Sequence, residues 1–144
     1  MTYPPRPARK HASPEADFQQ AVVVYLKYAL PPEWRFRGSL EGALRSVQAG
    51  AKAKALGMRK GWPDIELKHR QTGQVVWIEL KSATGSLLPE QREFRDECQN
   101  AEPPVTWALA RTLEEVERAL ISFGILPTCA IEKANRYSLD DVPR

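Results

Sequence analysis

Long apolar runs are absent from the sequence, and none approaches the roughly 18 residues that a membrane span requires. The first twelve residues are rich in proline and basic residues and lack the apolar stretch of a signal peptide. Cysteine is also scarce, because Cys98 and Cys129 are the only two and lie in unrelated segments. They offer neither a disulfide framework nor the ligand spacing of a zinc site. These absences predict a protein of the cytoplasm, bacterial or viral-host, with no membrane partner.

Charge is nearly balanced in number but uneven in position. The net charge is +3, from 21 basic and 18 acidic residues. Between positions 35 and 60 the only acidic residue is Glu41, and this stretch contains the basic residues Arg35, Arg37, Arg45, Lys52, Lys54, Arg59 and Lys60. Such a segment indicates a surface that contacts a polyanion, although solvated helix faces carry similar charge without any partner.

Helix and strand patterns alternate along the chain and predict one domain of the α/β class. We expect a disordered basic arm at 1–12, the domain at 13–130 and a C-terminal tail at 131–144. Helical spacing and capping residues predict helices from Ser13 to Pro31, at 43–56, at 89–100 and from Thr112 to Gly124. Strand patterns occupy 34–37, 64–69, 75–81 and 105–110.

The two central strands, 64–69 and 75–81, are predicted to form a hairpin around the turn 71–74. If Arg70 faces Val75, apolar residues pair on one face of the hairpin, Ile65 with Leu80 and Leu67 with Ile78. The same register sets two polar pairs on the other face, Asp64 opposite Lys81 and Glu66 opposite Glu79.

This polar face suits metal chemistry. Glu66 and Glu79 placed opposite each other would repel, and a bound cation would relieve the repulsion. Carboxylate oxygens without a nearby cysteine favour Mg²⁺ or Mn²⁺ over Zn²⁺. Lys81 could then stabilise charge on a phosphate transition state. An exposed sheet edge with ordinary ion pairs is the alternative that spacing alone leaves open.

Several short segments resemble the PD-(D/E)xK nucleases and, among them, the virus-type replication-repair nuclease (VRR-NUC) domain. Pro63-Asp64 and Glu79-Leu80-Lys81 resemble the signature of that superfamily, and Gly57 and Gly61 resemble its flanking glycines. Two further segments are similar to the family, the stretch 39–46 and the stretch 87–91. The resemblance covers residues 13–125 and implies a restriction-endonuclease-like fold, with a small central mixed β-sheet flanked by helices.

The resemblance also implies roles for particular residues. Asp64, Glu79 and the backbone carbonyl of Leu80 would bind Mg²⁺ or Mn²⁺, and Glu15 on the first helix would complete the site. Lys81 would be the catalytic lysine and Gln91 a glutamine near the active centre. Leu88 departs from the family, which often has a serine there.

The activity implied is a metal-dependent, structure-selective DNA endonuclease that resolves four-way (Holliday-type) junctions as a homodimer. A flap or general DNA nuclease of the same fold is one alternative. A catalytically silent nucleic-acid-binding module is another, but all four expected polar positions, Glu15, Asp64, Glu79 and Lys81, are filled. Trp62 and Trp77 could stack on bases, although packing is the commoner fate of tryptophan.

Overall fold

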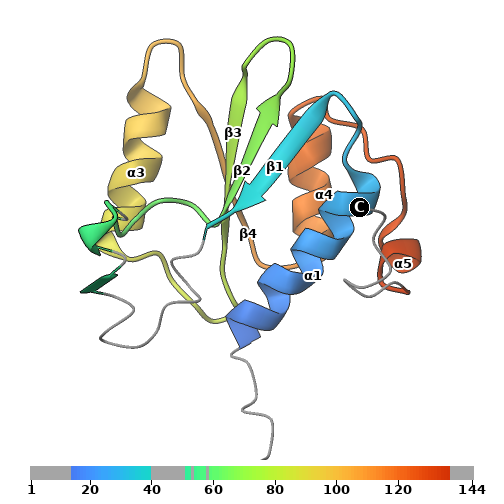
Figure 1. Ribbon diagram of the computed structural model, residues 1–144, viewed down its shortest axis with the longest axis horizontal. Coiled ribbons are helices and arrows are strands. Elements are labelled where there is room, and N and C mark those ends of the chain that lie inside the picture. Colours follow the sequence, from blue (N-terminus) through green and yellow to red (C-terminus); the bar gives the residue numbers. More distant parts are fainter. Residues whose placement is uncertain (1–13, 40–50, 53, 58, 137–144) are drawn as a thin grey trace, which may run out of the picture.

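A four-stranded mixed sheet organises the chain in the computed structural model, which describes residues 14–39, 51–52, 54–57 and 59–136 (Figure 1). The strands are β1 (Trp34–Gly38), β2 (Ile65–His69), β3 (Val75–Leu80) and β4 (Thr106–Ala110), and they lie in the order β1-β2-β3-β4. The first two pairings are antiparallel and the last is parallel. The predicted small mixed sheet flanked by helices is therefore confirmed.

Helices cover both faces of the sheet (Figure 1). On one side lie α1 (Pro14–Ala29), α4 (Leu113–Ser122) and α5 (Ile131–Ala134), and on the other lies α3 (Pro89–Asn100). The helical spacing of α1 buries Val22, Tyr25, Leu26 and Ala29 completely. They pack with the inward residues of β2 and β3 and with α4, and this cluster is the hydrophobic core.

Capping explains where the helices begin and end. The side chain of Thr112, the N-cap residue of α4, accepts a hydrogen bond from the Glu115 N–H (3.1 Å), and the Glu115 carboxylate accepts one from the Arg111 N–H, so only one half of a capping box is formed. After α4, Gly124 has φ +78°, a conformation that glycine adopts without strain. Of the helix expected at 43–56, residues 51–52 and 54–55 are described and are helical. Leu56, the expected last residue of that helix, lies in a turn, and residues 43–50 and 53, the arm at 1–12 and the residues 137–144 lie outside the described residues.

The packed fold extends past the boundary expected at residue 130. The Thr128 N–H donates to the Ala29 carbonyl (2.8 Å) and ties this segment to the end of α1. Ala134 of α5 is then fully buried in the core. The start of the expected C-terminal tail is therefore a part of the domain. No helix among the described residues has the length and apolar character needed to cross a membrane.

The predicted hairpin register is wrong by two residues, because the turn occupies 70–73 rather than 71–74. The His69 N–H donates to the Gln74 carbonyl (2.8 Å), and Gly73 closes the turn at φ +75°. The Nδ1 atom of His69 accepts hydrogen bonds from the N–H groups of Gln71 and Thr72. Ile65 therefore faces Ile78, and Glu66 faces Trp77 instead of Glu79. A shift of two residues preserves the faces, so the apolar side of the hairpin still points into the core.

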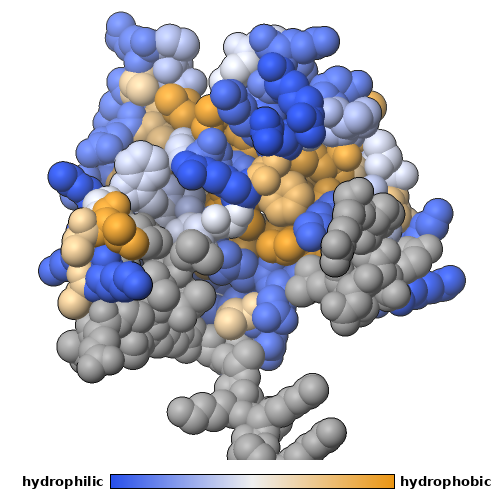
Figure 2. Space-filling model, in the orientation of Figure 1, coloured by the Kyte–Doolittle hydropathy of each residue, from blue (hydrophilic) through white to orange (hydrophobic). Residues whose placement is uncertain are grey.

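Hydrophilic residues surround a hydrophobic centre on the face shown in Figure 2. Trp34 and Phe36 of β1 are partly buried against the edge of the core. Between them, Arg35 is exposed, and Arg37 follows it on the same face of the strand. The alternation of β1 therefore places two arginines on the side of the sheet opposite to the core.

Candidate active site

The end of β3 meets the beginning of α1 and the loop that leads into α3 (Figure 1). Asp64 directly precedes β2, and its Oδ2 atom accepts a hydrogen bond from the Leu80 N–H (2.8 Å). This bond holds the Asp64 carboxylate against the last residue of β3. The expected register set Asp64 opposite Lys81. In the structure the Asp64 carboxylate instead contacts the backbone of β3, the strand that carries Glu79.

Glu79 is the most buried carboxyl group described near this point, with 2% of its surface exposed. Its Oε1 atom accepts a hydrogen bond from Gln91 Nε2 (2.8 Å) and lies 3.8 Å from Lys81 Nζ. Lys81 is itself only 7% exposed. Buried charges are costly unless they are paired, and here Glu79 of β3 is paired with Lys81, which directly follows the strand, and with Gln91 of α3.

Asp64 and Glu79 also share a hydrogen bond between their carboxyl groups. Burial, and after it the charge of Asp64, raise the pKa of Glu79 to about 9, although the charge of Lys81 opposes the shift. Burial also raises the pKa of Asp64, although the Leu80 N–H opposes the shift. At neutral pH the pair consequently holds a proton that a divalent cation could replace.

Glu15, at the start of α1, adds a third carboxylate, whose negative charge contributes to the raised pKa of both Asp64 and Glu79. A Cβ atom built on Gly85 would lie 3.5 Å from Glu15 Oε1 and 3.6 Å from Lys81 Cδ. The turn that follows β3 therefore packs against both side chains, and the five candidate residues Glu15, Asp64, Glu79, Lys81 and Gln91 gather in one place.

The donors present fit a hard divalent cation. In the part of the chain that the structure describes, no three His, Cys, Asp or Glu side chains form a ready-made metal cage. The donor set is the Asp64–Glu79 pair, with backbone oxygens and Glu15 nearby. Mg²⁺ is commonly held by one or two carboxylates and completes its shell with water and substrate phosphates. Such a sparse oxygen site suits Mg²⁺ or Mn²⁺ better than it suits Zn²⁺.

Arg111 was not anticipated from the sequence. It follows β4, and its Nη1 atom donates to the carbonyls of Ser82 (2.6 Å) and Gly85 (2.5 Å). The Gly85 N–H in turn donates to Ser82 Oγ (3.0 Å). Arg111 thus clamps the turn that contacts Glu15 and Lys81. Its position directly after the strand expected at 105–110 is the only signal that the sequence offered for it.

The predicted basic surface is exposed where it is described. Arg35, Lys52, Lys54, Arg59 and Lys60 are all exposed, and Arg45 lies outside the described residues. Arg37 is 74% exposed and forms an ion pair with Glu66 (2.9 Å), which offsets part of its charge. Lys68 faces Arg35 across β1 and β2 and is also exposed, so it adds a cation that the sequence analysis omitted.

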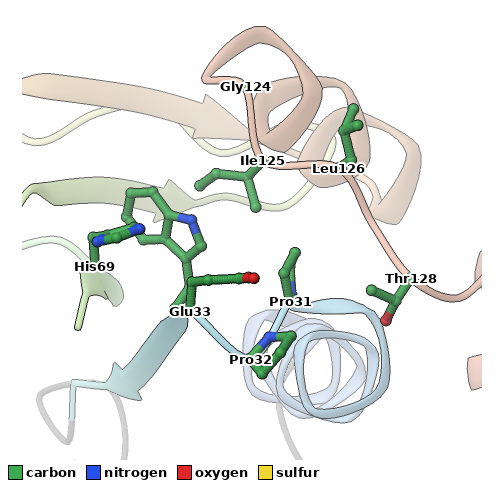
Figure 3. Close-up of a pocket in the computed structure, with 9 residues that line it drawn as sticks. Pro31, Pro32, Glu33, His69, Gly124, Ile125, Leu126 and Thr128 are labelled. Atoms are coloured by element: carbon green, nitrogen blue, oxygen red, sulfur yellow. The ribbon is translucent and has the colours of Figure 1, made fainter. Parts of the chain in front are cut away.

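An open pocket of about 420 Å³ lies at the opposite end of the hairpin (Figure 3). It is lined by residues 31–34, His69, residues 124–126 and Thr128. The Nδ1 atom of His69 is engaged by the turn, and Trp34 packs edge-on against its ring at 5.0 Å. None of the candidate site residues lines this pocket, so it is separate from the cluster around Glu79.

Comparisons with known proteins agree with this geometry. The sequence model of the VRR-NUC domain matches residues 34–112, more than half of the chain, and this range contains Asp64, Glu79, Lys81, Gln91 and Arg111 but not Glu15. A solved structure described as a VRR_NUC domain protein is similar with a TM-score of 0.54 and 19% identity, over 76% of this chain and 86% of that one. At this identity the likeness supports the fold. No curated protein matches the sequence.

Proposed function

The chain belongs to the VRR-NUC domain family of PD-(D/E)xK-type nucleases, and from this premise we propose that it is a divalent-metal-dependent endonuclease acting on branched DNA. The observation that carries the proposal is the buried Asp64–Glu79 pair, with Lys81 Nζ 3.8 Å from Glu79 Oε1. A fold that used these residues only for stability would gain more from apolar side chains of similar volume.

We assign the ion-binding role to Asp64, Glu79 and the Leu80 carbonyl, with Glu15 completing the site. Mg²⁺ or Mn²⁺ would supply Lewis-acid activation of the scissile phosphate and of the attacking water. Gln91 fixes the orientation of the Glu79 carboxylate through the 2.8 Å hydrogen bond. Lys81 would neutralise the charge that develops on the phosphate oxygens, and its burial beside Glu79 supports this role.

The proposed substrate is branched double-stranded DNA, with the four-way junction as the leading candidate. The exposed cations at 35–37 and 52–60 support contacts to phosphates of DNA arms that meet near the site. A homodimer is part of this proposal, because two copies related by a two-fold axis present two sites to the two strands of a symmetric junction.

Two alternatives share the same observations. A flap or general DNA nuclease would use the same side chains on a different substrate. A silent nucleic-acid-binding module would retain the fold without cutting. The buried Glu79 and Lys81 weigh against the silent module, because burial of unneeded charge lowers stability.

The test is a cleavage assay with end-labelled four-way, flap and linear DNA in Mg²⁺, Mn²⁺ or chelator, together with the mass of the protein measured by light scattering. The proposal expects paired, symmetric cuts at the four-way branch point by a dimer, only with a divalent cation. Cuts in a single arm would favour the flap nuclease. Binding without cleavage in any metal would favour the silent module.

A further inference from the structure

Trp62 is the most exposed of the four tryptophans, with 46% of its surface accessible. It nevertheless packs against two aromatic rings. The ring centroids of Trp62 and Trp77 are 5.6 Å apart at an interplanar angle of 75°, and those of Trp62 and Phe94 are 5.1 Å apart at 56°. Edge-on and tilted contacts of this kind hold the indole in place while leaving much of the ring uncovered.

The backbone on both sides of Trp62 is also constrained. Gly61 has φ +94°, and a Cβ atom there would lie 2.7 Å from the Glu90 carbonyl oxygen, so only glycine fits against the first turn of α3. Pro63, on the other side, is buried and has a restricted φ. The ring contacts and the constrained flanking residues already restrict the Trp62 side chain. It therefore loses little conformational entropy when a ligand binds to it.

The aromatic cluster adjoins the candidate active site through three elements. Trp62 lies two residues before Asp64 in the chain. Trp77 and Glu79 are two residues apart in β3, so their side chains lie on the same face of the strand. Phe94 follows Gln91 by three residues on α3 and therefore lies on the same side of the helix. A ligand that covered the exposed part of Trp62 would lie beside the carboxylates.

Packing alone does not account for this exposure. Packing is the expected fate of tryptophan, and the contacts of Trp77 and Phe94 fit that expectation. Yet Trp62 and the N-cap residue of α3, Leu88 (53% exposed), both leave large apolar surfaces in water. Arg59 and Lys60, also exposed, directly precede Gly61. Cations next to an exposed, immobilised aromatic ring are typical of surfaces that bind single-stranded nucleic acid.

We propose that Trp62 is a stacking platform for an unpaired nucleobase next to the scissile phosphate, an inference that rests on the proposed nuclease function. A base inside a continuous duplex has both faces covered by its neighbours. A base at a branch point, a flap or a strand end has a free face. Trp62 therefore selects DNA whose bases are unpaired or terminal where the strand enters the site.

The experiment compares the affinity of the protein for two DNAs in Ca²⁺ or chelator, where no cleavage is required. One is a flap DNA with 5-iodo-deoxyuridine as its first unpaired base, and the other is a duplex with the same base inside. Trp62→Leu is expected to weaken flap binding roughly tenfold and to leave duplex binding unchanged, whereas Trp62→Phe retains most of the affinity. Ultraviolet irradiation is expected to cross-link the flap base to Trp62, as located by mass spectrometry.

Trp34→Leu is the matched control, because Trp34 is a partly exposed tryptophan packed edge-on at the opposite end of the hairpin. Circular dichroism verifies folding, and Trp62→Met replaces the leucine variant if that variant unfolds. An equal loss for flap and duplex, or unchanged flap binding without the cross-link, would overturn the inference. If the unmodified protein cuts no DNA but shows the selective effect of Trp62, the proposed nuclease function fails while the stacking site stands.

Discussion

The two faces of the sheet differ in composition although the same strands build both. Toward α1 and α4, Ile65, Leu67, Val76 and Ile78 are fully buried. Toward α3, the alternate positions of β3 are Trp77 and Glu79, and α3 itself contributes only Phe94 and Cys98 as large or buried apolar residues. The alternation of a strand thus assigns stability to one face and polar chemistry to the other. Substitutions on the two faces should have separable effects.

The largest effect is expected for Asp64→Asn, which removes a charge on the polar face. DNA cleavage in Mg²⁺ should fall on the order of 10³-fold or more, because residues that act as a unit cannot compensate for one another. DNA affinity and thermal stability should change little. Asp96→Asn is the control, since Asp96 is an exposed acid (54% side-chain exposure) on α3. Undiminished Mg²⁺-dependent cutting by Asp64→Asn would locate the active centre elsewhere.

Ile78→Ala tests the other face one residue away from Glu79. It should lower the free energy of unfolding by about 2–5 kcal/mol, because a fully buried side chain leaves a cavity. The remaining folded protein should cut DNA at an unchanged rate at low temperature. Urea denaturation and a cleavage assay on the same samples measure the two quantities. A loss of activity larger than the loss of folded protein would mean that the faces are coupled.

Neutralising Lys52, Lys54, Arg59 and Lys60 to glutamine should weaken DNA binding and flatten its dependence on salt. Each lost phosphate contact lowers the slope of log affinity against log salt by roughly 0.9. Binding is measured by fluorescence anisotropy between low and high salt. The control neutralises four exposed cations on the α1, α4 and α5 side, Lys27, Arg118, Lys133 and Arg136. Equal salt slopes for the two variants would show that the DNA-binding surface lies outside residues 52–60.

The pKa of Glu79 predicts a pH dependence of stability in chelator. Its folded value of about 9 is above the ordinary 4.5, so the folded state binds the proton more tightly. The stability contributed by the protonated group is fully present below pH 4.5 and is lost as the pH rises through 9. The melting temperature should therefore fall between pH 6 and 9, and Mg²⁺ should restore it. Glu79→Gln should flatten this profile and respond little to Mg²⁺; a flat profile in the parent would contradict the pKa shift.

The smallest effect is expected for Arg111, which acts through the turn 82–85 rather than on the substrate. Arg111→Ala should lower kcat by roughly tenfold, as the loss of a well-placed positioning group does, with less change in KM. Arg111→Lys should recover part of the rate, because one ammonium can still reach a carbonyl. Arg118→Ala, an exposed arginine on α4, is the control. If Arg111→Ala has the same kcat and KM as the parent, the hydrogen bonds of Arg111 to the turn have no role in catalysis.

Local patterns predicted the secondary structure well and the pairings less well. The helix expected from Ser13 to Pro31 is present as α1, because helical periodicity is a property of the chain alone. The hairpin was recognised, but its register was off by two because Gly73 and the His69 ring decide where the turn closes. The end of the domain was missed because the four residues of α5 have no strong helix pattern and are ordered by packing on α1.

The sequence by itself determined which residues face the core and which acids, amides and lysine are available near one end of β3. Alternation and helix capping depend on neighbouring residues, so they can be read locally. Only the tertiary structure decided that Glu79 is buried against Asp64, that Arg111 holds the turn at Gly85, and that this turn touches Glu15. These contacts join residues far apart in the chain, and desolvation, which raises the pKa of Glu79, exists only once α1, α3 and the sheet enclose the site.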